Sequence, residues 1–439
     1  MPKTNCDRNF DARLLSRRSA LKLSSTALLL SAAKAALPGG AFAQGAGPEV
    51  KGTKLGYIAL TDAAPLIIAK EKGHYAKYGL PDMDIAKQAS WGATRDNIAL
   101  GTKANGIDGG HILSPKVHLY ATGKVMQNNQ PLPMYTLMRL NEDCQGLSVS
   151  NEYKHLAVGT DSSALKEAFA KKAASGKEVK VAMTFPGGTH DLWIRYWLAA
   201  GGIDPDKDVA TIVVPPPQMV ANMKVGTMDA FCVGEPWNEQ LVNQDIGFTA
   251  ATTGEIWFKH PEKVLGMRAD WVDANPKATQ AILMATMEAQ QWCEKPENKN
   301  EMAEIIGRRQ WFNVPVPDII GRIKGDINYG RGRVEKGTKL GMKFWGEGGA
   351  VSYPWKSLDT WFVTENIRWG KFAPDTDIKA LVAKTNRSDL WLEAAKALGV
   401  AGAPTGDSRG VEKFFDGKVF DAADPAAYLK SLSIKRATV

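Results

Sequence analysis

The chain has 439 residues, of which 44% are hydrophobic and 23% are charged. This composition is typical of one large or two medium globular domains. The formal net charge is +8, but residues 1–43 carry +5 of it, which leaves +3 for the rest of the chain. So small a charge argues against a nucleic-acid partner and suits an anionic ligand. No stretch after residue 43 reaches the roughly 18 apolar residues of a membrane span.

The N-terminal segment has the pattern of an export signal. Arg17 and Arg18 precede a mainly apolar run from Leu23 to Ala33, and Ala41-Phe42-Ala43 forms an A-x-A cleavage motif. The paired arginines, followed by Leu21 and Lys22, resemble a twin-arginine signal, and the alternative is a Sec signal that contains two arginines. We therefore predict a signal over residues 1–43 that is cleaved near Ala43, and a soluble periplasmic protein exported by the twin-arginine pathway.

After the signal, strands and helices alternate, which predicts an α/β fold. Strands are expected over residues 54–60, 84–88, 107–113, 132–140, 178–185, 209–214 and 226–234. Helices are expected over residues 63–72, 94–100, 164–172, 190–200 and 215–224. The chain beyond residue 263 is predicted to be mostly helical, with helices over 276–293, 319–327 and 376–398 and a Gly-rich, exposed insertion over 330–353.

The stretch Phe185–Trp197 reads as a strand end, a Pro-Gly-Gly turn and a helix with Thr189 at its N-cap. Such a unit directs free backbone N–H groups and a positive helix end at one point, where small anions bind readily. His190 follows at the first helical position. Small or polar residues also occupy the junctions at Thr61-Asp62, Ser90–Gly92 and Val233–Pro236. Ligands of open α/β sheets lie at such strand ends.

Several motifs in order resemble one family. They are Leu60–Pro65, Lys70–Gly73 with Tyr75, Tyr78–Leu80, Gln88–Asn97, Phe185–Trp197, Val213–Gly234 and His260–Arg268. They resemble the two-domain periplasmic substrate-binding proteins of the sulfonate, taurine and nitrate group. Within that group they are most similar to the nitrate-binding proteins of assimilatory nitrate/nitrite ABC transporters and their bicarbonate-binding relatives. The resemblance covers residues 54–439.

The resemblance implies a type II C-clamp of two α/β lobes with the ligand in the cleft between them. Lobe 1 would comprise residues 50–147 and 256–439, and lobe 2 residues 148–255. It also implies the residues that contact the anion, which are Trp91, Gln145, His190, Gly234 and Lys263. Three of these lie at the junctions described above, whereas Gln145 and Lys263 come from the resemblance alone.

The identity of the anion depends on two of these positions. Nitrate-binding members of the family carry His and Lys at the positions of His190 and Lys263, as this chain does. Bicarbonate-binding members carry Gln and Glu there, and the Glu helps to hold calcium. Nitrate cannot donate a hydrogen bond, so we expect a site made only of donors and positive charge. Lys263 would supply the charge, His190 a ring N–H, Gln145 its amide NH2, Gly234 a backbone N–H, and Trp91 an indole N–H or an apolar wall.

Three further polar residues near these positions are not expected to contact the anion. Asp62, Thr189 and Glu235 are expected to cap helices or support the ligand groups. No metal motif, phosphate loop or nucleophile elbow is present in the sequence. The odd number of cysteines beyond the signal, Cys144, Cys232 and Cys293, leaves at least one free thiol, and each is expected to be buried.

The predicted function is therefore the capture of nitrate, and also nitrite, for an inner-membrane ABC permease with a cytoplasmic ATPase. The protein is expected to be a monomer and not an enzyme, without cofactor, metal or nucleic-acid partner. Two alternatives remain. One is a nitrate sensor like the cytoplasmic relatives that regulate nitrate assimilation, which the export signal disfavours. The other is a bicarbonate receptor, which His190 and Lys263 disfavour.

Overall fold

The structure, a computed structural model, describes residues 47–437. The predicted export signal over residues 1–43 lies outside the described residues. Between residues 47 and 437, no helix has the length and apolar character needed to cross a membrane.

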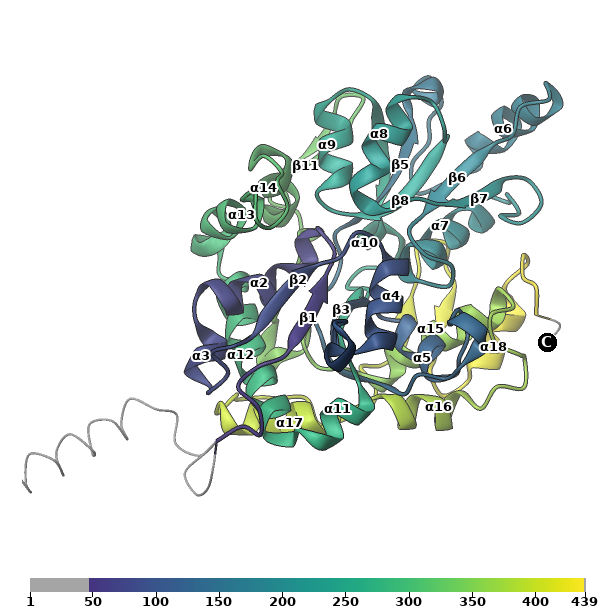
Figure 1. The fold of residues 1–439 in the computed structure, drawn as a ribbon. Helices are drawn as coiled ribbons and strands as arrows, with labels where there is room; N and C mark the ends of the chain where they lie inside the picture. Colours follow the sequence, from purple (N-terminus) through teal and green to yellow (C-terminus); the bar gives the residue numbers. More distant parts are fainter. Residues whose placement is uncertain (1–46, 438–439) are drawn as a thin grey trace, which may run out of the picture. The chain divides into compact units, whose positions relative to one another are not determined.

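Two five-stranded sheets form the framework, and the fold class is the predicted α/β (Figure 1). The first sheet has the order β2-β1-β3-β10-β4. Its strands are β1 (Lys54–Tyr57), β2 (Asp84–Lys87), β3 (Gly109–Leu113), β4 (Met134–Arg139) and β10 (Lys263–Arg268). The second sheet has the order β7-β6-β8-β5-β9. Its strands are β5 (Gln145–Ser150), β6 (Lys180–Met183), β7 (Ala210–Val213), β8 (Ala230–Gly234) and β9 (Gly247–Thr252).

The two sheets share one topology. In the first sheet β10 runs antiparallel to both of its neighbours, and in the second sheet β5 does the same. The other pairings are parallel. Each antiparallel strand is the first strand that the chain forms after it has passed from one sheet to the other.

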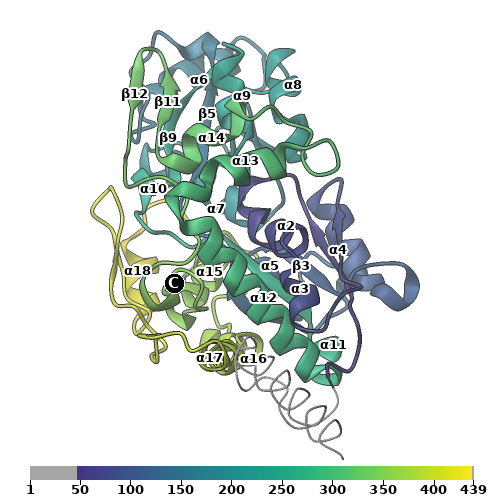
Figure 2. The ribbon, with the colours of Figure 1, turned by 90° about the vertical axis from the view of Figure 1, so that its left-hand side faces the viewer.

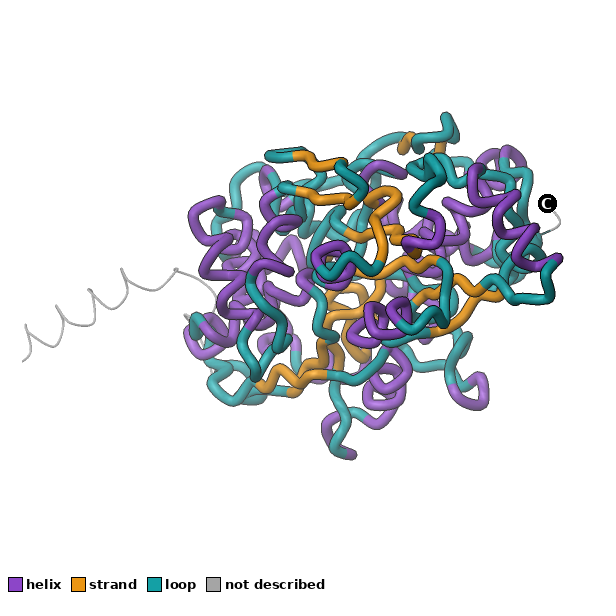
Figure 3. The backbone as a smooth tube through the Cα atoms, turned by 90° about the horizontal axis from the view of Figure 1, so that it is seen from above, coloured by secondary structure: helices purple, strands orange, loops and turns teal. Residues whose placement is uncertain are grey.

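Helices surround the strands, as the view from above shows (Figure 3). Up to residue 274 they are α2 (Ala64–Glu71), α3 (His74–Lys77), α4 (Trp91–Leu100), α5 (Lys116–Ala121), α6 (Ala164–Ala174), α7 (Thr189–Ala200), α8 (Met219–Lys224), α9 (Trp237–Asn243), α10 (Thr253–Ile256) and α11 (Ala269–Ala274). The later helices are α12 (Pro276–Glu294), α13 (Lys299–Gly307), α14 (Pro317–Lys324), α15 (Lys356–Arg368), α16 (Ile378–Thr385), α17 (Ser388–Ala397) and α18 (Pro425–Ser431). Two short hairpins complete the fold, β11 (Ile327–Gly330) with β12 (Arg333–Glu335) and β13 (Glu412–Lys413) with β14 (Val419–Phe420).

The long helix α12 begins with Pro276 at its first turn, where proline is tolerated, and packs against α2, α3 and α17 (Figure 2). A second packing centre joins α7 to the C-terminal part of the chain. There the ring of Trp193 stacks on that of Trp361 with centroids 5.0 Å apart, and Trp257 meets Trp361 edge-on at 4.9 Å. All three tryptophans are buried, so this cluster fixes the start of α7 relative to α15.

The chain passes between the sheets twice, through residues 140–144 and through residues 253–262. The two crossovers are hydrogen-bonded to each other. The backbone N–H of Asp143 donates to the carbonyl of His260 at 3.1 Å, and next to this bond the N–H of Leu140 donates to the carbonyl of Lys263, the first residue of β10, at 2.8 Å. As a result, Gln145 at the start of β5 and Lys263 at the start of β10 both emerge beside this junction.

Several local predictions are corrected. Helix α4 begins at Trp91 rather than at residue 94, because the Ser90 hydroxyl accepts the N–H of Ala93 and caps the helix there. Strand β10 lies in the region predicted to be mostly helical. The stretch 376–398 is two helices, separated by Asn386 and Arg387.

The segment 330–353 is not simply an exposed insertion, because Met342, Phe344 and Tyr353 within it are buried. The expectation for the cysteines is confirmed. Within residues 47–437, Cys144, Cys232 and Cys293 are all buried free thiols.

Candidate anion-binding site

Four of the five predicted ligand residues meet at one atom, the amide oxygen Oε1 of Gln145. The ring nitrogen Nε2 of His190 lies 2.9 Å from it, and the ammonium Nζ of Lys263 donates to it at 3.5 Å. Gly234 pairs with Gln145 across the sheet, and a Cβ added to Gly234 would lie 2.5 Å from the same oxygen. The side chains of Gln145, His190 and Lys263 are fully buried, so this oxygen accepts from two donors at a point that water does not reach.

His190 owes its position to the turn that precedes α7. Its Nδ1 lies 2.6 Å from the hydroxyl of Thr184, which leaves Nε2–H to donate to Gln145. Burial, with a contribution from Lys263, holds the pKa of His190 well below its ordinary value. The ring is therefore a neutral hydrogen-bond donor at this point.

The predicted capping role of Thr189 is wrong. The N-cap of α7 is Gly188, and His190 is the second helical residue. The hydroxyl of Thr189 donates instead to Oε2 of Glu262 at 2.9 Å. At the same turn, the N–H of Gly187 is taken by the Asp191 carboxylate at 2.7 Å, so part of the predicted backbone cradle is satisfied within the protein.

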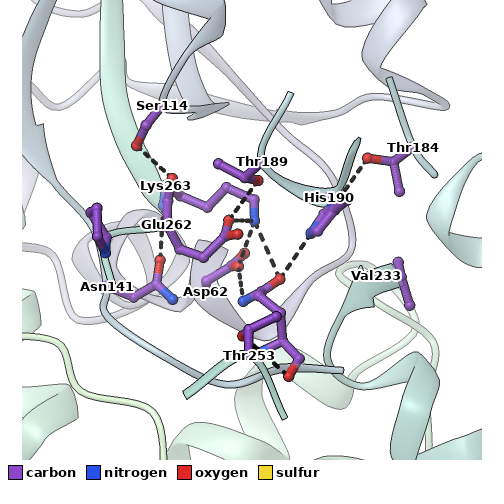
Figure 4. A network of polar contacts seen from close by, with 12 residues as sticks. Asp62, Ser114, Asn141, Thr184, Thr189, His190, Val233, Thr253, Glu262 and Lys263 are labelled. Atoms are coloured by element: carbon purple, nitrogen blue, oxygen red, sulfur yellow. Dashed lines mark hydrogen bonds and ion pairs between the residues drawn. The ribbon is translucent and has the colours of Figure 1, made fainter. Parts of the chain in front are cut away.

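Lys263 lies between two carboxylates, and Figure 4 shows this arrangement. Its Nζ is 3.0 Å from Oδ2 of Asp62 and 2.5 Å from Oε2 of Glu262. Burial opposes the charge of Lys263, but the two carboxylates outweigh burial and raise the pKa of the lysine. The expectation of a site made only of donors and positive charge is therefore wrong, because two buried acids share the ammonium.

Asp62 does not cap the helix that follows it. The helix α2 begins at Ala64 without a side-chain cap, and Oδ1 of Asp62 lies 2.6 Å from Nε2 of His111. Burial alone would raise the pKa of Asp62, but Lys263 and then His111 outweigh it and lower that pKa. Asp62 thus holds its charge and orients Lys263.

Trp91 is not among the residues that meet at Gln145. Its ring lies 5.4 Å from that of His111, which connects it to the site through Asp62. Within residues 47–437 the indole N–H of Trp91 has no hydrogen-bond partner, although the side chain is fully buried. A buried donor without a partner is costly, which is consistent with a ligand that supplies the acceptor.

Glu235 binds at the start of helix α9, in keeping with the capping role expected of it. Its carboxylate accepts the N–H of Glu239 in α9 at 3.1 Å and lies 3.1 Å from Arg322. Sequence reasoning missed His111, Thr184 and Glu262. A histidine inside the buried strand Gly109–Leu113 was a signal for His111, whereas nothing local marked Glu262.

The site lies at the carboxyl ends of β3, β6 and β8 and at the starts of β5 and β10, where ligands of α/β sheets bind. Within the described residues, no group of three or more His, Cys, Asp or Glu side chains could hold a metal ion. The arrangement offers an ammonium and an imidazole N–H to one acceptor oxygen, beside a strand end at Gly234 that has no room for a side chain.

Two similarly wound sheets, two crossovers and buried polar groups at the strand ends are the architecture of periplasmic substrate-binding proteins. The crystal structure of the periplasmic nitrate-binding protein NrtA from Synechocystis PCC 6803 superposes with a TM-score of 0.86 at 59% identity, over 89% of this chain and 100% of that one. The chain belongs to the NMT1-like family, whose model matches residues 46–307.

Three curated proteins are similar to this chain over most of its length. The nitrate/nitrite binding protein NrtA of Synechocystis sp. is 60% identical over 391 residues, which is 88% of this chain and 86% of the relative. The bicarbonate-binding protein CmpA of Synechococcus elongatus is 47% identical over 398 residues, 89% and 88% of the two chains. The nitrate import ATP-binding protein NrtC of Synechocystis sp. is 34% identical over 393 residues, 89% of this chain but 57% of that protein.

Proposed function

We propose that the protein is the periplasmic solute-binding component of an ABC importer, and that it captures nitrate, and also nitrite, for the membrane permease. The observation that carries the proposal is the convergence of His190, Lys263 and the Gly234 strand end on one acceptor oxygen. In the structure that oxygen belongs to Gln145. An oxygen of nitrate would take its place, and the Gln145 side chain would turn its NH2 group toward the anion.

The five predicted residues Trp91, Gln145, His190, Gly234 and Lys263 are proposed as the ligand set. Lys263 supplies the charge that a monoanion requires, and the buried site strengthens each charge-assisted hydrogen bond. The relatives support nitrate over bicarbonate, because the nitrate/nitrite binding protein is 60% identical and the bicarbonate-binding protein 47%. We propose a substrate-binding role without catalysis.

The lobes proposed from the sequence would close over the anion. Gly234 belongs to the second sheet and His190 to helix α7, which follows β6 of that sheet, whereas Lys263 belongs to the first sheet and Asp62 follows its strand β1. A ligand that contacts both groups stabilises the closed form over the open one. The partners would be an inner-membrane permease and an ATPase, in keeping with the similarity to an import ATP-binding protein. We further propose export by the twin-arginine pathway and a monomeric state.

Titration calorimetry of the purified protein tests the proposal. Nitrate is expected to bind with one site per chain, and bicarbonate with calcium is expected to give no heat. Heat from bicarbonate plus calcium and none from nitrate would make the protein a bicarbonate receptor. Recovery of the uncleaved chain from the cytoplasm would favour the sensor.

A further inference from the structure

The buried charges around Lys263 do not balance. Asp62 and Glu262 each lie within 3.0 Å of its Nζ, and all three side chains are fully buried. The two neighbouring histidines are neutral donors, since burial lowers the pKa of both His111 and His190. The group formed by Asp62, Glu262 and Lys263 therefore carries a net charge of −1 before any ligand arrives.

A bound monoanion would bring this buried charge to −2. Ionised groups without compensation in a dry interior cost several kcal/mol, and such groups neutralise instead by shifting their pKa. A proton is the simplest compensation, because it enters from solvent and cancels the charge of the anion. One of the two carboxylates must accept it, and their surroundings differ.

Asp62 is held in its ionised form. His111 Nε2 lies 2.6 Å from one of its oxygens, while the other receives hydrogen bonds from Lys263 and from the Gln145 amide at 3.2 Å. Lys263 and His111 together lower the pKa of Asp62 in spite of its burial. Asp62 is therefore a poor acceptor for the proton.

Glu262 is better placed than Asp62 to accept the proton. Its carboxylate receives the indole N–H of Trp193 at 2.7 Å, the hydroxyl of Thr189 at 2.9 Å and the ammonium of Lys263. Of these three donors, only the Thr189 hydroxyl can turn round and accept a proton from the carboxyl group. The other charged or titratable groups that face Glu262 are Asp62 and the Cys232 thiol. Burial raises the pKa of Glu262, and Lys263 offsets this only in part.

We propose that the anion binds together with one proton, which the Glu262 carboxylate takes up. The new carboxyl O–H donates to the Thr189 hydroxyl, and Lys263 keeps its own proton and turns its ammonium from Glu262 to the anion. The charge of the site is then unchanged on binding. This inference rests on the proposed function, because the anion is taken to be nitrate.

The test is titration calorimetry of the full chain with nitrate in two buffers of different ionisation enthalpy, at several pH values between about 6 and about 9. The slope of the heat against buffer ionisation enthalpy gives the number of protons taken up. It is expected to rise to about one at the upper end, where the affinity falls about tenfold per pH unit. Nitrate binding with no buffer dependence at any pH overturns the inference and leaves the proposed function intact. Absence of nitrate binding removes the proposed function itself.

Glu262→Gln tests whether Glu262 is the group that takes up the proton, because the amide is neutral at every pH and has nearly the same size as the carboxyl group. The variant is expected to bind nitrate without proton uptake and with an affinity that does not change with pH. The matched control is Glu239→Gln, since Glu239 is also largely buried and has a raised pKa but pairs with Arg322. The control is expected to keep the proton uptake of the unmodified protein. Uptake that survives in a folded Glu262→Gln protein assigns the proton elsewhere and refutes the inference.

Discussion

Replacing Lys263 by Met removes one charge from the centre of the site and keeps an unbranched side chain that lacks only the terminal ammonium. In the folded protein the change leaves Asp62 and Glu262 buried without their shared counter-ion, at positions that water does not reach. Removing one partner of a buried ion pair costs about 3–5 kcal/mol. Because Lys263 serves two carboxylates, we expect a loss of about 5 kcal/mol in the free energy of unfolding at pH about 8. Nitrate binding is lost as well.

The loss should depend on pH in a direction that can be worked out. Without Lys263, burial raises the pKa of both acids above their values in the unfolded chain, so the folded variant binds more protons than the unfolded one. Its stability is therefore greatest at low pH and falls as pH rises. Urea unfolding at pH about 5 and about 8 measures this difference by linear extrapolation. The control is Lys224→Met, which changes an exposed lysine at the end of α8.

A loss below about 1 kcal/mol at pH about 8, the range of surface ion pairs, would show that water reaches the two carboxylates. An equal loss at both pH values would show that the acids stay ionised without the lysine. Either result would refute the reasoning for a dry, charge-coupled site.

Three further predictions concern other parts of the fold. Gly234→Ala places a Cβ 2.5 Å from Gln145 Oε1 and should weaken nitrate binding at least about tenfold in calorimetry. The control is Gly159→Ala, whose Cβ meets nothing closer than 4.0 Å and which should leave the affinity unchanged. The Arg409 guanidinium bonds Glu142 in one crossover at 2.5 Å and the carbonyl of Lys259 in the other at 2.6 Å. Arg409→Ala should therefore lower the free energy of unfolding in urea by about 3 kcal/mol. A loss under about 1 kcal/mol would show that Arg409 does not hold the two crossovers together. Burial would raise the pKa of Asp359, but Arg139 outweighs it and lowers that pKa from 3.8 to about 2. About 2 kcal/mol of stability that is present above pH about 4 should therefore disappear as pH falls to about 2. In Asp359→Asn this loss of stability between pH about 4 and about 2 should be missing.

The alternating part of the fold was predictable because its signals are local. The apolar runs around β1, β6 and β8, each followed by small or polar residues, predicted both the strands and the edge at which ligand groups gather. The same pattern brought His190 and Gly234 into the candidate set before any family resemblance was considered. Gly234 is the last residue of β8 and His190 comes shortly after β6, so their positions depend on a few neighbours in sequence.

The two antiparallel strands were missed because their partners are distant in sequence. Strand β10 pairs with β3, some 150 residues earlier, and begins with the charged Lys263. Strand β5 follows Asp143 and Cys144, which adopt φ angles of 60° and 64° without the glycine that usually marks such a backbone. Strand propensity depends on the neighbouring strands that a segment meets, and these segments carry no strong propensity of their own.

The pairing of charges was also beyond the sequence. Asp62 and Lys263 are separated by 201 positions, and either residue alone reads as a helix cap or a surface charge. Only the folded chain shows that both are buried and that Glu262 completes the group. The error in the predicted charge of the site has the same origin. The prediction included only the groups that would contact the anion and left out Asp62 and Glu262, the acids that hold Lys263.

The topology gives a physical reason why the ligand groups lie where they do. Gln145 and Lys263 are the first residues after the two crossovers, and the Nζ of Lys263 meets the Oε1 of Gln145 at 3.5 Å. The contact joins the two sheets, because Lys263 begins β10 in the first sheet and Gln145 begins β5 in the second. It is also a weak contact, at the limit of hydrogen-bond length. An anion oxygen that accepts from both Lys263 and His190 would replace it with two hydrogen bonds, one from β10 of the first sheet and one from α7, which follows β6 of the second sheet. We infer that a bound anion would join the two sheets beside the crossovers, where Gln145 and Lys263 lie close together.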